Sequence, residues 1–147
     1  MNSELPDAKV AKVAQKSPKE LPEERGDCSH AVIGAAVEVQ RVLGTGLLES
    51  AYAAALSIEM EQRGLRFCRE VAVAGKYKER DIGLAYRAGF IVEDAVVVEV
   101  KAVDAWVEAH RAQLLSYLRL SGHKIGLLIN FHAFPVTKGI QRLVNKL

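Results

Sequence analysis

Two apolar segments, residues 95–103 and 123–131, constrain the fold of this chain more than any other feature. The first contains three consecutive valines at 96–98, and β-branched side chains favour extended strands over helices. The second, HKIGLLINF, carries few charged residues, which is typical of a strand buried in a sheet. The sequence therefore predicts at least two strands, of which the second is buried.

Helices and further strands surround these two segments. The expected elements, in chain order, are helices 29–43 and 47–63, strands 66–77, 81–92 and 95–103, a helix 106–120, the strand 123–131 and a short basic helix after Pro135. The tight link Glu93-Asp94 predicts a hairpin between the second and third strands. The order α-α-β-β-β-α-β-α predicts an α/β (α+β) fold with a central mixed β-sheet flanked by helices.

Helical spacing also predicts which side chains face the core. In the first helix these are Val32, Ala36, Val39 and Leu43, and in the second they are Leu48, Tyr52, Ala55 and Leu56. Paired glycines at 44 and 46 predict a sharp reversal between these helices, and Gly64 is expected to end the second.

The chain is long enough for one domain and too short for two ordinary ones. Residues 1–27 contain three of the four prolines and no aromatic residue, so they bury too little apolar surface to order themselves. We therefore expect a flexible or partner-bound tail over 1–27 and a folded domain over 28–147. This tail and the apolar strand at 124–131 are surfaces that a second copy of the chain could cover, which predicts a homo-oligomer.

Composition excludes several classes of protein. Half of the residues are hydrophobic and 26% are charged, as in ordinary globular proteins. No apolar run approaches the ~18–20 residues that cross a bilayer, so no membrane partner is expected. The acidic N-terminus does not resemble a signal peptide, and two cysteines, Cys28 and Cys68, fit reduced thiols. The expected location is cytoplasmic.

Charge is distributed unevenly along the chain. Residues 28–108 contain nine Lys/Arg and twelve Asp/Glu, whereas residues 109–147 contain six Lys/Arg and no acidic residue. An acidic centre followed by a basic end could combine a metal site with a nucleic-acid surface. The alternative is that these cations only keep helix faces soluble.

The strand at 95–103 also carries the strongest candidate for chemistry. Alternation along a strand places Glu99 and Lys101 on one face, at the end of an otherwise apolar segment. A carboxylate there can hold a divalent cation, and the adjacent amine can orient a water molecule on it. The alternative is an ion pair that satisfies two partly buried charges, which is common for so short a motif.

Further motifs point to a known family. The segment Gly46-Leu47-Leu48-Glu49-Ser50-Ala51-Tyr52 has the spacing G-x-x-E-x-x-Y, and the chain resembles the GxxExxY family, a branch of the PD-(D/E)XK nuclease superfamily with RecB-like features. Further matching segments, in chain order, are Tyr86-Arg87-Ala88, Val98 to Ala102, His110, Ala112 to Leu115 with Tyr117, and Gly126 to Phe131. The resemblance implies a restriction-endonuclease-like core.

The same resemblance implies roles for individual residues. Glu99 and Lys101 would be catalytic, and Glu99 and Glu49 would hold Mg²⁺ or Mn²⁺, with no organic cofactor. The residues implied to position a nucleic-acid substrate are Gln113, Tyr117, Tyr52 and Arg87. From the sequence alone, Glu49 could equally be an acid that favours the start of a helix. The pair Gln113 and Tyr117 could equally be a helix face packed on the sheet.

One position departs from the family pattern. The second strand of the family normally reads Tyr-Arg-Ala-Asp, and that aspartate supplies the central metal ligand, but here the segment ends in Gly89. Because glycine has no side chain, any cation would bind weakly, and we expect impaired catalysis in a nuclease-like fold. Two alternatives stay open: an active metal-dependent DNA nuclease that hydrolyses phosphodiesters, and a non-catalytic, self-assembling structural module.

Overall fold

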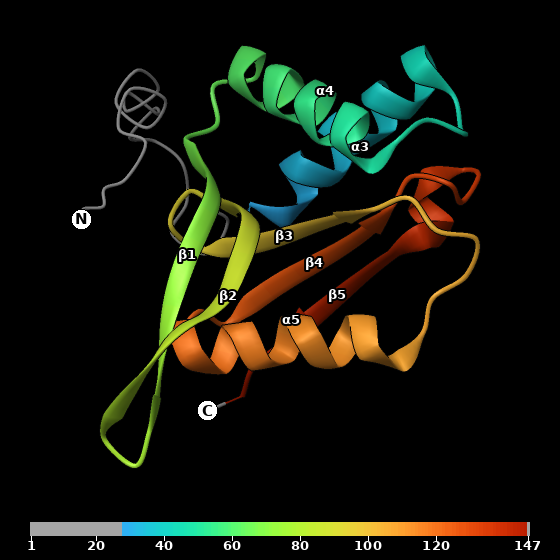
Figure 1. Ribbon diagram of the computed structural model, residues 1–147. Coiled ribbons are helices and arrows are strands. Elements are labelled where there is room, and N and C mark those ends of the chain that lie inside the picture. The colour runs from blue at the N-terminus through green and yellow to red at the C-terminus, as the bar shows by residue number, and fades with distance from the viewer. Residues whose placement is uncertain (1–27, 147) are drawn as a thin grey trace.

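The computed structural model describes residues 28–146, so the tail expected at 1–27 lies outside the described residues. The elements in chain order are α3 (Ser29–Leu43), α4 (Glu49–Gln62), β1 (Phe67–Tyr77), β2 (Arg80–Val92), β3 (Val96–Lys101), α5 (Glu108–Ser121), β4 (Ile125–Asn130), the 3₁₀ helix η1 (Val136–Gly139) and β5 (Ile140–Val144). This mixed sheet flanked by helices confirms the predicted fold class (Figure 1). Within the described residues, no helix combines the length and the apolar character needed to cross a membrane.

The sheet has five strands in the order β1-β2-β3-β4-β5. Strands β3 and β4 are parallel because α5 connects them, and the other neighbouring strands are antiparallel. The hairpin expected at Glu93-Asp94 is present, with Val92 opposite Val96. The strand β4 lies between two other strands, and its apolar side chains are buried. It therefore offers no apolar surface to a partner chain, contrary to our expectation for 124–131.

Two hydrophobic clusters lie on opposite faces of the sheet. Helices α3 and α4 cover one face, where they pack on Phe90, Val98 and Leu127. Helix α5 covers the other face, where Leu114 and its neighbours pack on the sheet. The alternation of β3 places Val96, Val98 and Val100 in the first cluster and Val97 in the second.

A glycine lets α5 approach the sheet closely. A Cβ atom at Gly126 would lie 2.9 Å from Leu114 Cδ2 and 3.2 Å from Leu118 Cδ1. Real Cβ atoms do not come this close to side-chain carbons in a packed interior. The helix that leads from β3 to β4 therefore sits directly on the small residue at the start of β4.

The segment after Pro135 differs from the predicted helix. The short basic helix expected after Pro135 is a single turn, η1, followed by the strand β5. The strand β5 pairs with β4 from Ile125–Val144 to Ile129–Ile140 and buries Leu143 against α5. Because β4 would otherwise leave one row of backbone groups unpaired, strand pairing outweighs the local helical preference of this segment.

Candidate functional site

The sheet divides at Gly89. The β2–β3 ladder pairs only Phe90–Val92 with Val96–Val98, so the next pair in register would be Gly89 with Glu99. The β1–β2 ladder, by contrast, continues for the whole length of both strands, as far as Tyr77 and Arg80. The strand β2 therefore leaves β3 at Gly89 and opens a notch between them.

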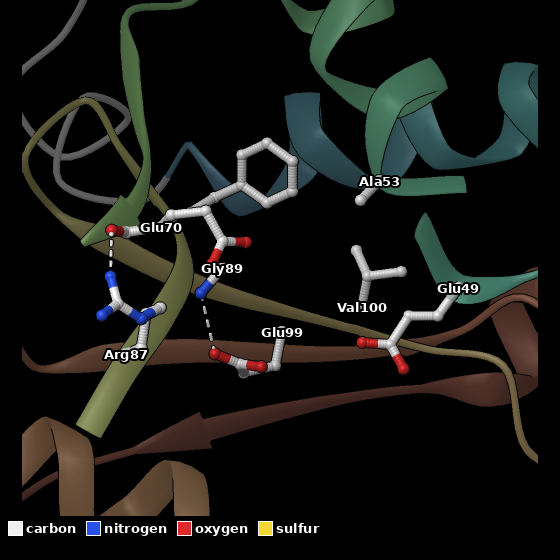
Figure 2. A pocket seen from close by; sticks show the side chains of 8 residues that line it. Glu49, Ala53, Glu70, Arg87, Gly89, Glu99 and Val100 are labelled. Carbon is white, nitrogen blue, oxygen red and sulfur yellow. Dashed lines mark hydrogen bonds between the residues drawn. The ribbon is translucent and has the colours of Figure 1, made fainter. Parts of the chain in front are cut away.

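A pocket occupies this notch (Figure 2). The residues that line it come from four elements: Glu49 and Ala53 of α4, Glu70 of β1, Arg87, Gly89 and Phe90 of β2, and Glu99 and Val100 of β3. Three of these side chains are carboxylates and one is a guanidinium. The pocket brings together Glu49, Arg87, Gly89 and Glu99, which the sequence had singled out from three separate segments.

The carboxylate of Glu99 is buried at this point, with 8% of the residue exposed. Its Oε2 atom accepts a hydrogen bond of 2.9 Å from the backbone N–H of Gly89 (Figure 2). Burial raises the pKa of Glu99, and the charge of Glu49 raises it further. The hydrogen bonds from Gly89 and from the Tyr86 hydroxyl, and the charge of Lys101, lower the same pKa. Desolvation is the largest of these effects.

Gly89 leaves the side-chain position next to this carboxylate empty. A Cβ atom built on Gly89 would lie 3.9 Å from Oε2 and 4.0 Å from Oε1 of Glu99. A carboxylate at position 89 would therefore extend from the immediate neighbourhood of the Glu99 oxygens. The same Cβ would lie 3.1 Å from the Val98 carbonyl oxygen, so a side chain here requires a small backbone adjustment.

Glu49 enters the pocket from the first turn of α4. A carboxylate is stabilised at this end of a helix by the unpaired backbone N–H groups and the helix dipole. In Figure 2 its side chain extends from α4 toward β3. Glu49 also increases the electrostatic cost of ionising Glu99. Glu49 thus both favours the start of α4 and lines the pocket.

Tyr52 fixes the loop that precedes Glu49. Its hydroxyl donates a hydrogen bond of 2.7 Å to the Gly44 carbonyl and accepts one of 3.2 Å from the Leu47 N–H. Its ring is fully buried and stacks on Phe131 at a centroid distance of 4.7 Å. A fully buried side chain held in this way positions the start of α4, and therefore Glu49. The expected substrate-positioning role of Tyr52 stays a prediction.

The remaining candidates do not line the pocket. Lys101 is half-buried at the end of β3, and its charge acts on Glu99. Gln113 is exposed on α5, whereas Tyr117, one turn later, is fully buried. The ring of Tyr117 lies 4.9 Å from that of Tyr86, and the charge of Glu99 acts on both.

The two tyrosine hydroxyls differ in their surroundings. Burial raises the pKa of Tyr86 well above its ordinary value, and the nearby Glu99 carboxylate adds to this effect. Burial also raises the pKa of Tyr117 to about 12. The Tyr117 hydroxyl has no well-formed hydrogen bond among the described residues, although Ser121 is near enough to influence its pKa. The Glu99 carboxylate thus raises the pKa of both hydroxyls, and the two tyrosine rings lie against each other.

Two residues of the site were missed by the sequence analysis. Glu70 lies opposite Gly89, because the β1–β2 register places Arg69 with Phe90 and Val71 with Ala88. The register of the hairpin, once known, would have placed it there. Tyr86 belongs to a motif, but its position three residues before Gly89 gives no direct sign that Glu99 lies near enough to raise its pKa.

The residues of the pocket supply an incomplete donor set for a divalent cation. Magnesium and manganese prefer several oxygen ligands, usually including more than one carboxylate close together. Within the described residues there is no group of three or more His, Cys, Asp or Glu side chains placed to hold a metal ion. The side-chain position at Gly89, next to Glu99, contributes no donor atom.

Comparison with known proteins identifies a family for this chain. A family model described as the PD-(D/E)XK nuclease superfamily matches residues 26–143, which is most of the chain. No curated protein and no solved structure matches.

Proposed function

The chain belongs to the PD-(D/E)XK nuclease superfamily, and we propose that it is a GxxExxY-family member that binds nucleic acid but hydrolyses phosphodiesters poorly. The observation that carries this proposal is the empty position beside Glu99. A Cβ atom at position 89 would lie 3.9 Å and 4.0 Å from the two oxygens of a buried carboxylate, at the point where the sheet divides. A metal-dependent nuclease holds its cation with several carboxylates close together. In this chain position 89 provides no carboxylate beside Glu99.

The remaining pocket is consistent with weak Mg²⁺ or Mn²⁺ binding. Glu99 and Glu49 are the residues that would hold such an ion, which would supply Lewis-acid chemistry at a phosphate when bound. Two features work against it in this chain. Burial, which raises the pKa of Glu99, makes its ionised form more costly, and the Gly89 N–H occupies one of its oxygens.

Support for a nucleic-acid partner comes from residues outside the carboxylates. Arg87 is exposed, lines the pocket and has its Nη1 atom 3.5 Å from the Glu70 carbonyl oxygen, a long contact that leaves its other donors available. An arginine beside an acidic pocket can bind and neutralise a phosphate group that the carboxylates of the pocket would otherwise repel. We propose that Arg87, Lys101 and Gln113 position a nucleic-acid strand at the notch between β2 and β3.

A cleavage assay tests this proposal. Wild type, Gly89→Asp, Gly89→Asn and Lys101→Ala are incubated with labelled DNA and RNA in Mg²⁺ or Mn²⁺. Asparagine imposes nearly the same steric change as aspartate without the charge. We expect wild type and Gly89→Asn to cleave no faster than Lys101→Ala, and Gly89→Asp to cleave about tenfold faster or more. Cleavage by wild type at the rate of Gly89→Asp, lost in Lys101→Ala, would overturn the proposal in favour of an active nuclease.

A further inference from the structure

Beyond the notch, β1 and β2 continue as a two-stranded ribbon that projects from the sheet (Figure 1). We call residues 71–88 the ribbon arm. Its strands are joined at Lys78 and Glu79, whose φ angles of 50° and 70° form a tight two-residue turn. Such a turn matches the twist of the flanking strands and holds the tip in one shape.

One face of the ribbon arm belongs to the protein core, and the other is open. Val71, Val73 and Tyr86 pack against the cluster under α5. On the opposite face, Ala72 pairs with Arg87, and both are exposed, as is Ala74. Because Arg87 also lines the pocket, this face leads from the pocket past Ala72 to Ala74, where the exposed Leu84 lies opposite. The face is therefore open to another molecule.

The tip of the ribbon arm combines exposed cations with exposed apolar groups. Lys78 and Arg80 are exposed, while Lys76 forms an ion pair of 3.0 Å with Asp81. That pair leaves two cations at the tip against one acid, Glu79. The tip also exposes three large apolar side chains: Tyr77 at 63%, Ile82 at 60% and Leu84 at 59%. Exposed apolar groups on a projecting ribbon indicate contact with a partner.

The length of the ribbon arm matches a dimension of duplex nucleic acid. From Gly89 to Arg80 the strand advances nine residues, or about 30 Å at ~3.3 Å per residue. One turn of B-form DNA rises about 34 Å. A two-stranded ribbon also fits the major groove, where apolar side chains and cations contact bases and phosphates together.

We propose that the ribbon arm is a nucleic-acid contact, with Lys78 and Arg80 binding backbone phosphates about one helical turn from the pocket. This inference rests on the proposed function, because it assigns a duplex to the same site. A duplex accounts for the cations at both ends of the open face and for its continuity with the pocket. A second copy of the chain would account only for the apolar side chains.

Binding measurements with a matched pair of variants test the inference. Lys78→Asn/Arg80→Gln removes two tip charges, and asparagine tolerates the positive φ of position 78. As the control, Arg41→Gln/Arg63→Gln removes two exposed charges from α3 and from the end of α4, outside both the ribbon arm and the basic segment 109–147. Fluorescence anisotropy with a 30-base-pair duplex is recorded from 50 to 200 mM salt, with light scattering and melting curves for each protein.

The outcomes separate the inference from the proposed function. We expect the tip variant to bind about tenfold more weakly at 50 mM salt and to lose about 1.8 from its salt slope, while the control stays closer to wild type. Equal binding by the tip variant and the control would overturn the ribbon-arm contact alone. A tip variant that dissociates an oligomer but keeps its salt slope would assign the arm to a second copy instead. Absence of any duplex binding by wild type would overturn the proposed function and this contact together.

Discussion

The backbone N–H of Gly89 donates a 2.9 Å hydrogen bond to Oε2 of Glu99, across the point where β2 leaves β3. This bond joins the glycine just beyond the end of the β2–β3 ladder to the buried carboxylate of β3. Because the ladder ends one pair earlier, the amide of Gly89 has no strand partner on β3 and uses the glutamate instead. The end of the β2–β3 ladder at Phe90 and the present position of the Glu99 carboxylate are therefore linked.

The first prediction concerns the pH dependence of stability. Because the pKa of Glu99 is raised in the folded protein, the unfolded chain loses this proton first as pH rises above about 4.3. Between the unfolded and folded pKa values the folded state binds more protons, so this group's contribution to stability falls as pH rises and stays lower above the window. Glu99→Gln has no proton to lose. The difference in Tm, variant minus wild type, should become more positive from pH 4 upward and then level off.

Thermal melts of both proteins between pH 4 and pH 8 measure this difference. Other titrating groups are common to both proteins and largely cancel. A difference that is flat, or that falls as pH rises, would show that Glu99 is not a buried carboxyl with a raised pKa.

A second prediction concerns the loop before α4. Tyr52→Phe keeps the stacking on Phe131 but removes the hydroxyl that joins Gly44 and Leu47. Two partly buried backbone groups lose a partner, so the free energy of unfolding should fall by about 1–2 kcal/mol. Urea denaturation measures it. An unchanged midpoint would mean that the loop is held by other contacts.

The matching change at the second buried tyrosine should behave differently. Among the described residues, the Tyr117 hydroxyl is buried without a well-formed hydrogen bond. Tyr117→Phe should therefore leave the free energy of unfolding unchanged or raise it by up to ~1 kcal/mol, since a desolvated hydroxyl is removed. A decrease as large as that of Tyr52→Phe, in the same urea series, would show that the Tyr117 hydroxyl has a strong partner.

Much of the fold follows from local patterns in the sequence. The helix at Ser29–Leu43, the hairpin at Glu93-Asp94 and the buried strand at Ile125–Asn130 match residues with strong periodicity or a clear turn. The strand at Ile140–Val144 could not be predicted locally, because it forms only where β4 offers an unpaired edge. Leu48 was expected to face the core but is 76% exposed. The helix α4 begins at Glu49 and not at the predicted residue 47, so Leu48 is its N-cap.

The site was predictable in part. The positions of Glu49, Arg87, Gly89 and Glu99 around one pocket follow the order of the recognised motifs. Glu70 carries no motif, and only the register of β1 against β2 brings it opposite Gly89. Tyr52 belongs to a motif, yet its contacts show that it holds a loop. A motif identifies residues that matter, whereas burial and hydrogen bonds decide what each one does.

The measurement that tests the central claim most directly is a calorimetric titration of Mn²⁺ into wild type, Gly89→Asp and Gly89→Asn. If position 89 is the missing ligand, Gly89→Asp binds one ion about tenfold more tightly or better than wild type, and Gly89→Asn does not. Wild type binding Mn²⁺ as tightly as Gly89→Asp would contradict the account, because the pocket would then hold its cation without a side chain at 89.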